Sequence, residues 1–84
     1  MLLYEYNTQK EFNNMTVSYN KLFKLLIDKN MKKTELAKAI GIGQNTLAKL
    51  SKNQNVSMDV LIRICDVLKC NIGDIVDVVE KEDE

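Results

Sequence analysis

Residues 34–50 read TELAKAIGIGQNTLAKL, which is two short runs of helix-forming residues separated by the tripeptide Gly-Ile-Gly at 41–43. Isolated helices shorter than about 12 residues are marginal in water, so each run must be held by the other and by the rest of the chain. Gly41 ends the first run, because glycine tolerates the positive φ of a helix stop. The stretch predicts helices over about 33–40 and 44–51, joined by a tight turn.

Three further helices are predicted around this pair. One begins near Ser18 and stops near Asn30, one begins after Ser57, and a short one begins after Asn71. Serine and asparagine are good N-caps, asparagine also suits the left-handed stop, and each segment repeats apolar residues at helical spacing. No strong strand pattern follows residue 17. The predicted fold class is therefore all-α, a compact arrangement of five helices.

Composition narrows the range of functions. A chain of 84 residues has room for one domain with a single core. A chain of this size buries about 60 to 65% of the surface that it exposes when unfolded, so a large pocket is not expected. A run of about 18 apolar residues and a secretory signal are both absent, so we expect a cytoplasmic protein with no membrane partner. There is no histidine, and Cys65 and Cys70 supply only half of a zinc ligand set. We expect no catalytic residue, metal, cofactor or small-molecule ligand.

The formal net charge of zero hides an uneven distribution. Residues 17–54 carry eight lysines against Asp28 and Glu35, a formal charge of +6. Residues 55–84 carry eight acidic and three basic residues, a formal charge of −5. This division favours one face for a polyanion and another face turned away from it. The alternative is an ordinary solvated surface rich in lysine, and charge alone does not decide between them.

The pair of short helices and its turn resemble the helix-turn-helix of the lambda-repressor-like family, the phage Cro/repressor or xenobiotic-response-element type. That family places a small residue inside the first helix, a glycine four residues later and apolar residues at fixed steps beyond it. The matching positions here are Leu36, Ala37, Ile40, Gly41, Ile42, Leu47 and Leu50. The likeness extends from about Ser18 to Val76. It implies a sequence-specific DNA-binding regulator, a repressor that reads the major groove of duplex DNA with the helix at 44–51.

The resemblance also implies which residues contact DNA. Base-reading positions are occupied by Gln44, Asn45, Thr46 and Lys49, and phosphate-contacting positions by Lys33, Lys52, Asn53 and Asn55. Glutamine and asparagine can pair with adenine, and lysine can donate to guanine. Without the resemblance, all of these are ordinary solvent-facing polar residues. One departure concerns the helix at 33–40, where Lys32 and Lys33 replace the family's usual cap and glutamine, so that the cap shifts to Thr34 or the helix starts weakly.

One short reading helix contacts too few base pairs to find a site alone, so we expect a homodimer on a palindromic operator. The expected dimer interface is an apolar set in the acidic half of the chain: Ile72, Ile75, Val76, Val78 and Val79. The alternative is that these residues close the core of a monomer. A second function also stays open, in which the chain is an antitoxin-like module and uses this same fold to bind another protein.

The chain divides into three parts. Residues 17–79 form the predicted helix-turn-helix DNA-binding domain, and residues 80–84 form an acidic tail. Residues 1–16 are a leader that we expect to be mobile or dependent on a partner, although the stretch LLYEYN has the composition of an added strand.

Overall fold

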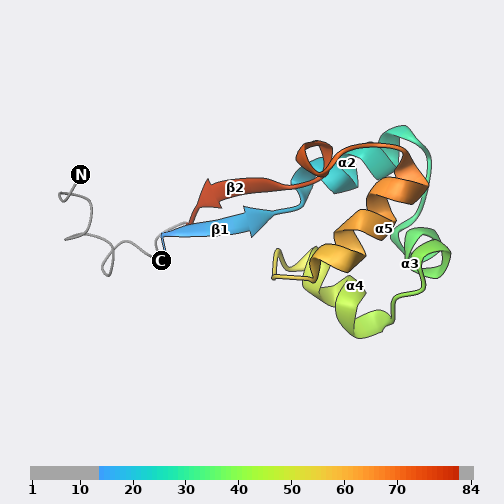
Figure 1. The fold of residues 1–84 in the computed structure, drawn as a ribbon, viewed down its shortest axis with the longest axis horizontal. Helices are drawn as coiled ribbons and strands as arrows, with labels where there is room; N and C mark the ends of the chain where they lie inside the picture. Colours follow the sequence, from blue (N-terminus) through green and yellow to red (C-terminus); the bar gives the residue numbers. More distant parts are fainter. Residues whose placement is uncertain (1–13, 82–84) are drawn as a thin grey trace.

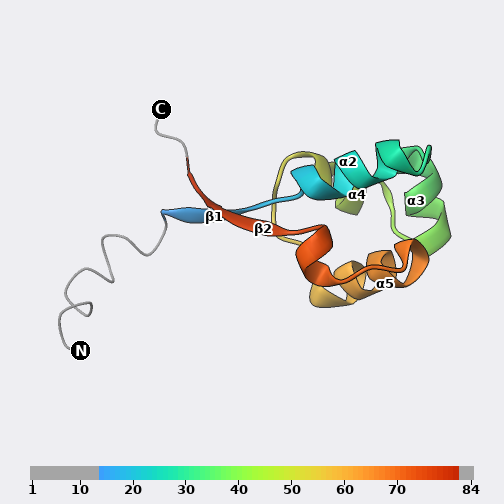
Figure 2. The ribbon, with the colours of Figure 1, turned by 90° about the horizontal axis from the view of Figure 1, so that it is seen from above.

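The computed structural model describes residues 14–81, which form a helical body with a two-stranded ribbon attached (Figure 1). The elements follow the order β1 (Met15–Ser18), α2 (Asn20–Asp28), α3 (Lys33–Ile40), α4 (Gln44–Ser51), α5 (Met58–Leu68), the 3-10 turn η1 (Ile72–Asp74) and β2 (Asp77–Glu80). The ribbon of β1 and β2 extends away from the helices in both views (Figures 1 and 2). Residues 1–13 of the predicted leader and residues 82–84 of the predicted tail lie outside the described residues.

Local sequence signals set the helix ends. Ser57 caps α5, since its Oγ accepts a hydrogen bond from the Val60 N–H at 3.2 Å. Asn30 follows α2 with a φ of 56°, the predicted left-handed conformation. Ser18 lies just before α2 rather than at its N-cap, and its Oγ accepts a hydrogen bond from the Asn20 N–H at 3.3 Å. The first helix therefore begins slightly later than the serine signal predicts.

The prediction of an all-α fold with five helices is wrong in its last part, since residues 14–81 form four α-helices and a small sheet. The segment after Asn71 makes only the short turn η1, and Asp77–Glu80 pairs antiparallel with β1. The valines before and within β2 favour extended backbone, because β-branched side chains fit a pleated surface better than a helix. Met15 and Thr16, which the sequence predicts as leader, lie in a strand of this sheet.

The hydrophobic core lies between the four helices and is closed by the segment after α5. Its buried side chains are Tyr19, Leu22, Leu26, Leu36, Ile40, Leu50, Leu61, Ile64, Leu68 and Ile75. Ile72 and Val76 pack against this cluster. Three residues of the predicted dimer interface thus contribute to the core of the protomer, because η1 packs against α5, while Val78 and Val79 remain exposed.

The turn between α3 and α4 and the neighbouring α5 set the position of the two short helices. Gly41 ends α3 with a φ of 75°, as predicted, and Gly43 holds extended backbone at the N-cap of α4. Arg63 of α5 reaches the carbonyl oxygen of Ile40 at the end of α3. The second helix of the pair is therefore held at a defined angle with its polar side exposed.

Candidate nucleic-acid interface

The outer side of α4 carries polar residues that the sequence predicts to read bases. Leu50 is buried and Leu47 is partly buried, so these side chains point toward the core. Gln44, Asn45 and Lys49 are exposed, and the four-residue spacing of Asn45 and Lys49 places them on one face of the helix. α4 therefore presents two amide groups and one ammonium group to solvent.

The packing of α3 beside α4 adds two residues that the sequence reasoning missed. Thr34 and Lys38 line a cavity of about 260 Å³ together with Gln44, and both are exposed. Their four-residue spacing on α3 was a signal that they share a face. Thr46, in contrast, is partly buried, which separates it from the exposed residues predicted with it.

The predicted phosphate contacts lie at helix ends and in the turn after α4. Lys33 is the first residue of α3, and its Nζ lies 4.3 Å from the centre of the Phe23 ring. This cation–π contact orients the ammonium group without neutralising its charge. Lys52 lies at the C-cap of α4, and Asn55 is exposed in the turn that follows.

Asn53, the remaining predicted phosphate contact, has a structural role. Its Oδ1 accepts a hydrogen bond from the backbone N–H of Tyr19 at 2.9 Å, and its own backbone is left-handed with a φ of 57°. The Tyr19 hydroxyl donates to the carbonyl oxygen of Gln54 at 2.8 Å. Burial raises the pKa of this hydroxyl, so it remains a donor at neutral pH. The two bonds fasten the turn after α4 to the start of α2.

The start of α3 is stabilised by a residue inside the helix. The carboxylate of Glu35 accepts a hydrogen bond from the backbone N–H of Lys32 at 2.8 Å, and Lys32 is the N-cap. The cap therefore does not shift to Thr34, because Glu35 makes the glutamate half of a capping box, while the Lys32 side chain has no acceptor and makes no cap bond. Lys32 and Lys33 stand at the positive end of the helix dipole, a position that favours a bound anion.

The lysines of the basic half do not share one surface. Lys33, Lys49 and Lys52 belong to α3, α4 and the C-cap of α4. A separate cavity of about 420 Å³, here named the α2–α5 cavity, is lined by Lys21, Lys24 and Lys29 of the basic half and by Lys69, together with the acidic residues Asp28 and Asp74. No residue of α4 lines it. Only part of the positive charge therefore lies near the predicted base-reading residues.

The two cysteines lie at the end of α5. Cys70 donates its backbone N–H to the carbonyl oxygen of Cys65 at 3.1 Å, just after Lys69 in the left-handed conformation. This is the Schellman ending of a helix, in which these two side chains normally contact each other. Both cysteines are free and partly buried, and burial raises the pKa of the Cys70 thiol.

No helix within residues 14–81 is long and apolar enough to span a bilayer.

These features coincide with a known class of protein. The model of the Cro/C1-type HTH DNA-binding domain family matches residues 21–81. The chain therefore belongs to the Cro/C1-type family of helix-turn-helix DNA-binding domains, and it is a DNA-binding transcription regulator. This confirms the resemblance that begins with the stretch at 34–50.

A solved structure supports the same assignment. The chain is similar to the crystal structure of the transcriptional regulator VanUg, form II, with 54% sequence identity and a TM-score of 0.80. The match covers 82% of this chain and 92% of that chain. A comparison with curated proteins found no match.

Proposed function

We propose that the protein is a transcriptional repressor that binds a specific operator with α4 in the major groove. The observation that carries this proposal is the exposed face of α4, where Gln44, Asn45 and Lys49 lie away from the buried Leu50. An α-helix fits the width of the major groove. Because the core occupies the inner face of α4, only this outer face is available to base edges.

The chemistry of that face favours particular contacts. The side-chain amides of Gln44 and Asn45 can each form a paired hydrogen bond with adenine, and Lys49 can donate to the O6 and N7 atoms of guanine. Thr46 is partly buried, so we assign it a contact with a thymine methyl group or the backbone. Thr34 and Lys38 approach the same groove from α3.

Phosphate contacts position the domain and carry no base preference of their own. We assign them to Lys33, Lys52 and Asn55, which are exposed around the helix pair. Asn53 contributes by holding the turn after α4 against Tyr19. A substitution at Asn53 therefore acts on DNA binding through the position of its neighbours.

Repression follows from occupancy, since a regulator bound to an operator excludes polymerase from an overlapping promoter. One α4 contacts few base pairs. Two protomers on a palindromic operator, with their reading helices in successive major grooves about 34 Å apart, supply the missing specificity. The protein acts in this proposal as a homodimer on DNA.

The direct experiment is a selection of bound duplexes from a random pool with the full chain. We expect a palindromic motif whose half-site centres are separated by about 10 base pairs. A promoter that overlaps this motif should then give less transcript in vitro when the protein is added. A pool without enrichment would contradict DNA reading and favour the antitoxin-like alternative, and an increase in transcript would contradict repression.

A further inference from the structure

A cavity of about 530 Å³ lies between the end of α2 and the start of α3, and it is here named the α2–α3 cavity. It is lined by the apolar residues Phe23, Leu26, Ile27 and Met31 and by the polar residues Lys32, Lys33 and Thr34. Leu26 is buried, whereas Ile27 is 76% exposed, the largest exposed fraction of any large hydrophobic side chain in residues 14–81. Mostly apolar walls with a few convergent polar groups are typical of small-molecule sites. The packing of α2 beside the start of α3 thus creates a kind of site that the chain length does not predict.

The charged groups of this cavity are all positive. Lys32 and Lys33 line it, and no acidic residue of the described chain does. Asp28 lines the α2–α5 cavity instead, and the carboxylate of Glu35 accepts a hydrogen bond from the backbone N–H of Lys32. Neither ammonium group lies within ion-pair distance of a carboxylate of residues 14–81. Two ammonium groups therefore stand beside an apolar wall without an ion-pair partner in this part of the chain.

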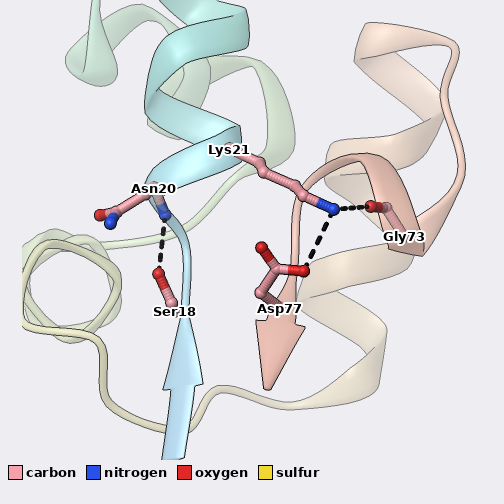
Figure 3. Close-up of polar contacts among 5 residues, drawn as sticks. All are labelled: Ser18, Asn20, Lys21, Gly73 and Asp77. Atoms are coloured by element: carbon pink, nitrogen blue, oxygen red, sulfur yellow. Dashed lines mark hydrogen bonds and ion pairs between the residues drawn. The ribbon is translucent and has the colours of Figure 1, made fainter. Parts of the chain in front are cut away.

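The lysines of the α2–α5 cavity are in a different situation. Asp28 and Asp74 line that cavity with them. The Nζ of Lys21 lies 3.1 Å from the Oδ1 of Asp77 and donates to the carbonyl oxygen of Gly73 at 2.9 Å (Figure 3). The charge of Lys21 is already used within the protomer, so the α2–α3 cavity is the better site for an external anion.

Lys33 joins the apolar wall to the surface proposed to meet DNA. Its Nζ lies 4.3 Å from the centre of the Phe23 ring, which is part of that wall. A cation–π contact leaves N–H groups of the ammonium free to donate to a carboxylate. Thr34, the next residue, lines this cavity and also the cavity of about 260 Å³ that Gln44 lines. The α2–α3 cavity thus adjoins the base-reading face of α4.

We propose that the α2–α3 cavity binds an amphipathic carboxylate, a small molecule with an apolar body and one anionic head, as an effector that weakens DNA binding. The apolar body packs against the four apolar residues of the cavity, and the carboxylate accepts hydrogen bonds from the ammonium groups of Lys32 and Lys33. Burial of apolar surface supplies the affinity, and the charge-assisted bonds select an anion. The effect on DNA rests on the proposed function, in which Lys33 contacts a phosphate, because carboxylate and phosphate then compete for one ammonium group.

Octanoate is the probe, and its binding to the full chain is measured without DNA by NMR titration of the backbone amides. We expect saturable shifts at residues 23–34 with a dissociation constant of about 10 mM or tighter, for a ligand of about ten non-hydrogen atoms. Octanamide has the same chain and a neutral head, so it should bind at least about threefold more weakly. Acetate has the same head without the chain and should give no saturable shift there.

Two outcomes of this titration would overturn the proposal. Equal binding of octanoate and octanamide would show an apolar patch that does not select an anion. Saturable binding of acetate at the same residues would show a simple anion site that does not use the apolar wall.

Two exposed isoleucines provide a matched pair of variants. Ile27→Ser removes part of the apolar wall, while Ile62→Ser makes the same change on α5, at a residue that is 56% exposed and lines none of the three cavities described above. We expect Ile27→Ser to weaken octanoate binding at least about threefold and Ile62→Ser to leave it within about twofold. Equal effects of the two variants would overturn the placement of the apolar body.

Lys33→Gln tests the placement of the anionic head, with circular dichroism as the check that the variant is folded. It should weaken the binding of octanoate at least about threefold and leave the binding of octanamide within about twofold, because only the anion uses the ammonium charge. A loss of the same size for both ligands would contradict this contact.

Competition with DNA is measured separately, by fluorescence anisotropy on the selected operator. Octanoate near saturation should weaken operator binding at least about threefold relative to the same concentration of acetate, which matches the ionic strength. Saturable octanoate binding with unchanged operator affinity would overturn the effector role. A wild type that binds octanoate but no duplex would instead fail the proposed function and leave the binding site standing.

Discussion

Arg63 of α5 donates a hydrogen bond from Nη1 to the carbonyl oxygen of Ile40 at 3.0 Å. Its Nη2 lies 2.8 Å from the Oδ2 of Asp59, one turn earlier on α5. Ile40 is the last residue of α3, so the guanidinium charge stands at the negative end of that helix dipole. One side chain thereby caps α3 and holds it against α5, which keeps the helix pair in position.

Replacing Arg63 by glutamine should lower the free energy of unfolding by about 1 to 2 kcal/mol, because a charge-assisted bond at a helix end is lost. Urea denaturation followed by circular dichroism measures the change. Lys69→Gln is the control, since Lys69 Nζ lies 3.6 Å from Asp66 in a highly exposed pair. Such a pair contributes at most about 0.5 kcal/mol here. Equal losses in the two variants would contradict the capping role.

Asn53→Ala should lower the free energy of unfolding by about 1 to 2 kcal/mol, while Asn55→Ala should change it by less than about 0.5 kcal/mol. The alanine removes the acceptor for the buried Tyr19 N–H. It must also adopt the positive φ of Asn53, which is unfavourable for residues other than glycine, asparagine and aspartate. Thermal and urea unfolding of both variants test this. If the two asparagine variants were equally stable, the bond to Tyr19 would not matter to the fold.

Gln44→Ala and Asn45→Ala should each cost about 1 to 3 kcal/mol on the selected operator and relax the base preference at particular positions. Lys33→Ala and Lys52→Ala should instead weaken binding to operator and random duplex alike, because phosphate contacts do not distinguish bases. Fluorescence anisotropy on both duplexes separates the two classes. Four variants with the same loss on both duplexes would show that α4 does not read bases.

Binding to duplex DNA should depend steeply on salt. If Lys38 and Lys49 neutralise phosphates beside Lys33 and Lys52, about four lysines of each protomer contribute, and the slope of log K against log salt for a dimer is about −7, from roughly 0.9 per contact. Lys52→Gln should reduce that magnitude by about 2, because a dimer loses two contacts. Lys24→Gln, in the α2–α5 cavity, is the control and should leave the slope unchanged. A flat wild-type response would contradict the electrostatic account.

The helix-turn-helix could be predicted because its signals are local. Gly41 supplies the positive φ at the end of α3, and Ser57 supplies the cap of α5. The helical spacing of the apolar residues places Leu47 and Leu50 on the core side of α4, so Gln44 and Asn45 lie on the solvent side. The start of α3 also depends on a local signal, Glu35 three residues after Lys32. This signal was not recognised, because the usual serine or threonine is absent from the N-cap.

The ribbon could not be predicted, because a strand is stabilised by a partner that is distant in the sequence. The apolar residues after Asn71 suit an amphipathic helix and a strand about equally well, and short apolar runs do not separate the two. Pairing with Met15–Ser18 decides in favour of β2. That pairing also sends Val78 and Val79 to opposite faces, which the prediction of one shared interface did not allow for.

The sequence by itself determined the four helices, the glycine turn and the polar face of α4, since each depends on residues within a few positions of one another. Only the tertiary structure decided the role of Asn53, whose partner Tyr19 lies on another element, and the burial of Ile75 in the core. It also decided which lysines stand near α4 and which line the α2–α5 cavity. Net charge and periodicity do not specify which distant segments contact each other, because those contacts form only when the helices pack together.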